Sequence, residues 1–253
     1  MYSIYISITL ALLTGFGWTF LNLWGGWAMG IFIGFLAFAG TWIIIGRKFN
    51  RLIQPAMVKA QKLAEAGQVA LAINAIESLL PLCNWIPMLK GQLYAQLGVL
   101  NLGARKEDQA IHYLKKASNR AAEAKLYLAA LFVRKNREDE AKSILNMAMR
   151  YNKKHVLLHN FYAFILKKVN DTQGAINILN TLLKKVPENE ASADNLSRLK
   201  NGKKLSMKPF GMHWYSLGLE RPPASMAPGN MQQQQQPRKG FRHPPKKQKR
   251  QKR

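Results

Sequence analysis

A repeated pairing of small residues constrains the fold of this 253-residue chain more than any other feature. Four times, a small residue is followed twelve positions later by an alanine, and apolar residues come four and seven positions after that alanine. Small residues let two antiparallel helices approach closely, and apolar residues at spacings of three and four line one helix face. Each unit therefore predicts one helical hairpin. The pairs are Ala60 and Ala72, Gly98 and Ala110, Ala129 and Ala141, and Ala163 and Ala175.

These units resemble the tetratricopeptide repeat, whose pattern is W-x2-L-G-x2-Y, then A-x3-F, then a proline over about 34 residues. The second unit has Tyr94-x2-Leu97-Gly98 and later Ala110-x3-Leu114, although Asn101 stands where the family has an aromatic residue. The fourth unit ends on Pro187, at the family's closing proline. The resemblance covers about residues 53–200. It implies an all-α solenoid of about four helical hairpins, which presents a groove to other proteins and carries no fixed chemistry.

The spacing of the units predicts where the array is interrupted. The alanines of the second helices lie 38, 31 and 34 residues apart, so an insertion containing Pro81 and Pro87 separates the first two units. Breaks between helices are expected at Gly67, Asn136 and Asn170, because glycine and asparagine tolerate the left-handed backbone of a helix end.

The resemblance also implies a binding site, because partners of this family bind along the concave face formed by the first helix of each hairpin. Here that face is apolar at one end and basic at the other, which favours an extended or helical peptide with an acidic portion. The alternative is that the basic side chains are merely solvated. Ala95 and Leu126 stand where some relatives have polar residues that hold a carboxylate, so binding of a chaperone tail is not expected. The expected groove residues are Gln92, Val99, Leu126, Arg134, Asn160, Phe164, Lys167 and Lys168.

The first 46 residues carry no charged side chain. As one helix, residues 2–45 would reach about 66 Å, roughly twice a ~30 Å bilayer core, so two passes fit better. The predicted spans are 4–21 and 28–45, joined by a turn at Asn22–Trp27 where paired glycines and tryptophans suit the membrane surface. A cleaved signal peptide is the alternative, because Ala37-Phe38-Ala39 mimics a cleavage site. The chain thus divides into a hairpin (1–46), a repeat domain (47–200) and a tail (201–253).

The charges beside the second span predict its orientation. Arg47, Lys48 and Arg51 follow it directly, which by the positive-inside rule places the repeats and both termini in the cytoplasm. A bacterial inner membrane is expected rather than a eukaryotic one, because the hairpin is compact and the chain has no recognised eukaryotic sorting sequence. A stripe of Gly26, Gly30 and Gly34 is expected to pack against the first span, or against a transmembrane helix of a partner.

No residue pattern predicts catalysis, a cofactor or a metal, and we expect a protein that is not an enzyme. Cys83 has no second thiol to pair with. His155 and His159 have the spacing of two metal ligands on one helix face, but no third ligand or glutamate motif accompanies them. Gly15-Phe16-Gly17 lies inside a predicted span and resembles no nucleotide-binding fingerprint.

A capping helix is expected over 188–200, because the last hairpin would otherwise expose an apolar face. Beyond it, 201–253 is predicted to be a disordered basic tail. An aromatic island at 208–219 within it either folds back onto the array or serves as a linear motif for a partner. The last sixteen residues have nine cations and no acid, and suit anionic lipid headgroups, RNA, ribosomes or acidic protein. These cations are Arg238, Lys239, Arg242, Lys246, Lys247, Lys249, Arg250, Lys252 and Arg253.

Together these features predict a membrane-anchored scaffold or adaptor whose cytoplasmic groove binds a protein partner. The alternative is a ribosome- or RNA-associated membrane factor that binds through the basic tail. A third possibility is assembly of a larger membrane complex through the glycine stripe.

Overall fold

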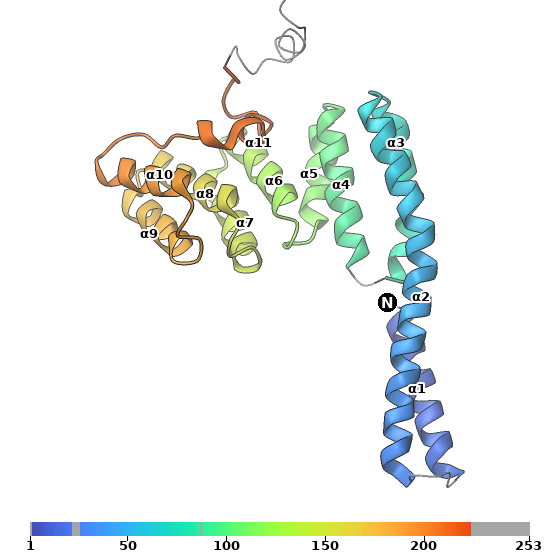
Figure 1. Cartoon of the computed structure of the whole chain (residues 1–253). Helices are drawn as coiled ribbons and strands as arrows, with labels where there is room; N and C mark the ends of the chain where they lie inside the picture. The colour runs from blue at the N-terminus through green and yellow to red at the C-terminus, as the bar shows by residue number, and fades with distance from the viewer. Residues whose placement is uncertain (1, 22–25, 87, 224–253) are drawn as a thin grey trace, which may run out of the picture.

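The computed structural model describes residues 2–21, 26–86 and 88–223, and this part of the chain is all-helical, without strands (Figure 1). Helices α1 (Tyr2–Phe20) and α2 (Gly26–Glu65) form a hairpin that projects from a stack of shorter helices. The all-α solenoid and its capping helix are confirmed. The stack contains α3 (Val69–Glu77), the 3-10 helix η1 (Leu80–Asn84), α4 (Leu89–Gly103), α5 (Glu107–Lys116), α6 (Ala122–Arg134), α7 (Glu138–Tyr151), α8 (Val156–Lys168), α9 (Thr172–Leu183), α10 (Glu190–Lys200), the 3-10 helix η2 (Lys208–Phe210) and α11 (Gly211–Tyr215).

The small residues of each unit lie where its two helices meet. Each of the eight sits on its own helix from α2 to α9, and all eight are buried. Gly98 shows why size matters: a Cβ atom there would lie 2.5 Å from the side chain of Leu114 on α5. An alanine at Gly98 would therefore force the Leu114 side chain or α5 itself to shift.

The turns inside the hairpins use the backbone conformation expected of them. Gly67, Asn136 and Asn170 have φ angles of 76°, 56° and 65°, as predicted for left-handed helix ends. The corresponding turn of the second unit uses Arg105, with a φ of 60°. Arginine gives no sequence signal for this conformation, so this break could not be predicted.

The boundary expected at residue 46 falls inside α2, which is continuous over 40 residues. One helix thus supplies both the second apolar span and the first helix of the first repeat. At ~1.5 Å per residue it is about 60 Å long, roughly twice the thickness of a ~30 Å bilayer core. The two expected spans correspond to α1 and the first half of α2, and both helices are long and apolar enough to cross a membrane.

The glycine stripe packs α2 against α1, which is the first of its two expected uses. A Cβ atom on Gly30 would lie 2.9 Å from the carbonyl oxygen of Gly15, and one on Gly34 would lie 3.0 Å from that of Ala11. Gly26 behaves differently, because nothing lies within 4 Å of its Cβ position and its φ is 58°. It begins α2 after the turn, whose residues 22–25 lie outside the described part of the chain.

The insertion between the first two units fastens the hairpin to the array. Trp85, just after η1, stacks on Phe49 of α2 with ring centroids 5.1 Å apart. Its ring also meets that of Tyr2 edge-on at 5.6 Å, and its carbonyl accepts a hydrogen bond from the Ser3 hydroxyl. The start of α1 is thereby held at the base of the array. Pro87 lies outside the described residues.

The sequence predicts a disordered tail from residue 201, but the described chain continues in a defined path beyond that point. Residues 203–219 return along the first helices of the third and fourth units, and Trp214 is fully buried. Its ring meets those of Phe161 and Phe164 edge-on, at 5.6 and 5.1 Å, and its Nε1–H donates to Glu220 at 2.8 Å. The aromatic island therefore folds back, because it covers aromatic surface that α10 leaves exposed. The rest of the predicted tail, residues 224–253, lies outside the described part of the chain.

We expect Trp214→Ala to lower the free energy of unfolding by about 3–5 kcal/mol, as loss of a large buried side chain does. Met212, two residues away and 47% exposed, provides the control, and Met212→Ala should change it by less than about 0.5 kcal/mol. Urea unfolding of the detergent-solubilised full chain measures both. Equal effects would show that the island does not pack as described.

The hairpin packing can be tested with two glycines of the same helix. Gly30→Leu should destabilise the hairpin by at least about 1–3 kcal/mol, because the added side chain overlaps α1. Gly40→Leu should have little effect, because nothing lies within 4 Å of that position. Thermal unfolding in detergent compares them. Equal stability of the two variants would favour use of the stripe by a partner helix.

Candidate partner-binding groove

The concave face is formed by the first helices of the four units, α2, α4, α6 and α8, and it divides into two cavities. The cavity here called the open half is lined by α2, α4 and the start of α6, and has a volume of about 1040 Å³. The other, here called the occupied half, lies between α6, α8 and the returning segment, and measures about 790 Å³. The open half adjoins the hairpin, because α2 forms one of its walls.

The open half combines apolar and amide side chains. Gln92 and Val99 lie here, as expected, and both are accessible. The residues that α2 contributes were not predicted. These residues are spaced three and four apart, as on one face of an amphipathic helix, and this spacing could have identified them. Glu123 is the one charged side chain among the described residues that line this cavity. The lining from α2 includes Gln54, Met57, Val58 and Gln61.

The occupied half contains part of the chain itself where a ligand was expected. Leu126 is 2% exposed, and Phe164 packs its ring against Trp214. Tyr127 on α6 and Ser216 on the returning segment place their hydroxyl groups 3.1 Å apart. Leu126 and Phe164 therefore hold the returning segment and are not presented to a partner.

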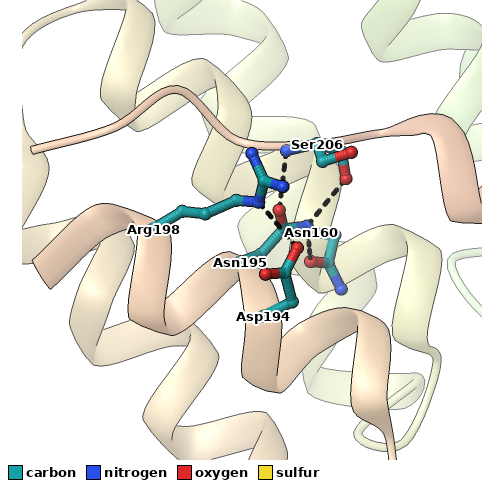
Figure 2. Close-up of polar contacts among 5 residues, drawn as sticks. All are labelled: Asn160, Asp194, Asn195, Arg198 and Ser206. Carbon is teal, nitrogen blue, oxygen red and sulfur yellow. Dashed lines mark hydrogen bonds and ion pairs between the residues drawn. The ribbon is translucent and has the colours of Figure 1, made fainter. Parts of the chain in front are cut away.

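A buried amide network fixes the start of the returning segment (Figure 2). The Asn195 side chain accepts from the Ser206 N–H at 2.7 Å and donates to the Ser206 carbonyl at 3.1 Å, so it binds the backbone on both sides. It also donates to Asn160 Oδ1 at 2.9 Å, and Asn160 donates to Ser192 at 2.7 Å. Asn160 is fully buried and satisfied within the fold, which corrects its expected place in the groove. Asn195, on the capping helix, was not predicted.

The basic residues expected at one end of the groove make contacts within the array. Arg134 bonds Glu107 at 2.8 Å, Lys168 bonds Glu138 at 2.9 Å, and Lys167 donates to a threonine hydroxyl at 3.0 Å. The hydrogen bond from Lys168 lowers the pKa of the Glu138 carboxyl. Arg134 and Lys168 link neighbouring units and Lys167 bonds within its own, so these cations are not aligned for an acidic ligand.

The two histidines with metal-ligand spacing have structural roles. His155 Nδ1 accepts from the Leu158 N–H at 3.2 Å and so caps the start of α8. His159 is 3% exposed, and its Nδ1 lies 2.9 Å from the His155 carbonyl oxygen. Burial lowers the pKa of both imidazoles. No group of three potential metal ligands occurs among the described residues.

The His155 cap predicts a loss of stability in acid. Its pKa is lower in the folded than in the unfolded chain, so protons bind the unfolded chain preferentially as the pH falls below about 6.5. His155→Asn keeps a capping side chain that does not titrate, and should reduce the loss of unfolding free energy between about pH 7.5 and pH 5. His155→Ala should instead cost about 1 kcal/mol at neutral pH. Urea titrations at several pH values measure this, and an unchanged pH dependence in His155→Asn would refute the assignment.

Comparisons with known proteins concern the fold alone. No protein-family model matches the chain, and no curated protein matches it. Among solved structures the chain is similar to the crystal structure of MamA protein, with 18% identity and a TM-score of 0.47. The match covers 66% of this chain and 89% of that one. The assignment of a helical repeat therefore rests on the helices described above.

Proposed function

We propose that this chain is a membrane-anchored adaptor that binds another polypeptide in the open half of its groove. In this proposal α1 and the first half of α2 cross a membrane twice, and the array lies in the cytoplasm. The observation that carries the proposal is the open cavity of about 1040 Å³, accessible and beside the hairpin. Residues 205–219 line the rest of the concave face and leave a smaller cavity of about 790 Å³ there.

Exposed apolar side chains on the hairpin support the membrane anchor. Phe16, Phe20 and Trp27 are 71%, 91% and 74% exposed, and residues 1–46 contain no charge. In water, such a surface would far exceed the few hundred Å² that soluble monomers usually expose. Lipid removes that cost, and helices satisfy their own backbone hydrogen bonds within it. Arg47, Lys48 and Arg51 favour the cytoplasmic side for the array.

The lining of the open half indicates the partner's chemistry. Side-chain amides can bond a peptide backbone or polar side chains, while Met57, Val58 and Val99 can receive an apolar stripe. Glu123 favours a partner with a basic residue at that end. The cavity starts at Asn50, about 7.5 Å along α2 from Ile45. The favoured partner is therefore the cytoplasmic segment of another membrane protein, close to its own span.

The groove is tested by photo-crosslinking in intact membranes. Val99 and Val169 are matched positions, 36% and 37% exposed, and only Val99 lines the open half. A photoreactive residue at Val99 should capture a polypeptide, and one at Val169 should not. A photoreactive residue at Gln96 should also capture a polypeptide, and this capture should be lost when Val99→Asp is added. Equal capture from both valine positions would contradict the proposal. Capture of RNA or ribosomal protein that requires residues 238–253 would favour the alternative function.

The anchor is tested separately. The protein should stay with membranes in alkaline carbonate and need detergent for release, because α1 and α2 are embedded in lipid. Protease added outside sealed cells should leave the array intact, because the array faces the cytoplasm. Release on lysis without detergent would contradict the anchor. Digestion of the array from outside would contradict its orientation.

A further inference from the structure

The loops of the array form two opposite edges. Successive helices run in opposite directions, so the loops between hairpins lie on the side from which α1 and α2 project, here called the near edge (Figure 1). The loops inside the hairpins lie on the other side, here called the far edge. The near edge comprises the loops around residues 85–91, 115–123, 150–156 and 184–190, and the far edge those around 66–68, 104–108, 134–140 and 167–172.

Contacts between its loops join the first three loops of the near edge into one surface. The Ser118 N–H donates to the Gly91 carbonyl at 3.4 Å, which joins the second loop to the start of α4. The Asn152 side chain donates to the Asn119 carbonyl at 2.9 Å, which joins the third loop to the second. At its other end, the near edge meets the hairpin through the stacking of Trp85 on Phe49.

The two edges differ in charge. On the far edge, acids and bases pair across units, as Glu107 with Arg134, Asp108 with Lys135, and Glu138 with Lys168. On the near edge, exposed cations outnumber the acids Glu123, Glu188 and Glu190. No ion pair between described residues includes any of these cations. They are Lys90, Lys115, Lys116, Arg120, Arg150, Lys153, Lys154, Lys184 and Lys185.

We propose that the near edge binds the anionic headgroups of the bilayer that holds α1 and α2. This inference rests on the proposed membrane anchor, and it concerns a surface separate from the groove and from the tail. Phe49 comes three residues after Gly46, so Phe49, Tyr2 and Trp85 lie where the second span leaves the hydrocarbon. Aromatic rings of this kind favour the membrane interface. The cations of the near edge continue outward from that level and meet the negative surface potential of anionic lipid.

Lipid fits the near edge better than a polynucleotide does. The near edge lies on the side of the array from which the hairpin projects. Insertion of the hairpin into a bilayer therefore already brings the cations of the near edge toward the lipid headgroups. Binding headgroups would hold the array along the membrane surface. The open half of the groove would then stay close to segments that emerge from neighbouring spans.

The test reports the distance of each edge from the headgroups. The full chain is reconstituted into vesicles of phosphatidylcholine, alone or with phosphatidylglycerol, that contain an energy acceptor on the headgroups. A donor dye is attached through Tyr151→Cys on the near edge or through Gln109→Cys beside the far edge, both exposed positions. Cys83 is buried, and burial raises the pKa of its thiol, so it should not react. A chain without an added cysteine confirms this.

Energy transfer from the dye on the Tyr151→Cys variant should rise when anionic lipid is added and fall again in high salt, which screens the attraction. Transfer from the dye on the Gln109→Cys variant should change little. Lys153→Gln with Lys154→Gln should remove at least half of the rise, whereas the matched far-edge pair, Arg105→Gln with Lys106→Gln, should leave it intact. The same results are expected after deletion of residues 238–253, because the near edge acts without the tail.

Each contrary outcome has a distinct meaning. Equal transfer from the near-edge dye in neutral and anionic vesicles, or equal effects of the two double variants, would overturn the role of the near edge. The double variant Lys153→Gln with Lys154→Gln could instead lose RNA binding in detergent while its energy transfer stays unchanged. That result would show that the near edge binds a polynucleotide and not lipid. Failure of the chain to float with neutral vesicles would instead overturn the membrane anchor, on which this inference rests.

Discussion

The geometry of this molecule depends on α2 being one unbroken helix. Its first half packs against α1 through Gly30 and Gly34, and its second half is the first helix of the repeat array. A continuous helix joins the hairpin directly to the array, whereas a flexible linker would let the array rotate freely. Each later hairpin stacks on its predecessor, so the direction set by α2 is passed along the array. Trp85 secures the same junction from the other side, through Phe49 and Tyr2.

The concave face is divided by an intramolecular contact. Asn195 bonds both the N–H and the carbonyl of Ser206, so the returning chain begins in a fixed register. Trp214 then fills the space beside Phe161 and Phe164, which a ligand would otherwise need to cover. An external peptide could reach Phe161 and Phe164 there only by displacing this fully buried tryptophan. The larger of the two cavities is therefore the one beside the hairpin, which the returning segment does not line.

The helices and their turns could be predicted because they depend on local spacing. Small residues twelve apart identify the paired helices, and Asn136 and Asn170 identify left-handed helix ends. The candidate site was harder to predict, because the position of a residue on a first helix does not show which distant residue will cover it. Asn160 faces the concave side in the pattern but bonds Asn195, 35 residues away. The continuity of α2 across the expected domain boundary at residue 46 could not be predicted, because a change from apolar to charged residues does not by itself break a helix.

The charge of the near edge goes beyond what helix dipoles require. Acids favour helix starts and cations favour helix ends. Two of the four second helices obey this rule, since α5 and α7 begin with acids on the far edge and end with cations on the near edge. First helices run the other way and should bring acids to the near edge in return. However, α4 and α8 have no acid in their first turn, and Lys153 and Lys154 precede α8. These two lysines add positive charge beside the N-terminus of α8, where the helix dipole disfavours it. An external anion bound at the near edge would compensate this repulsion.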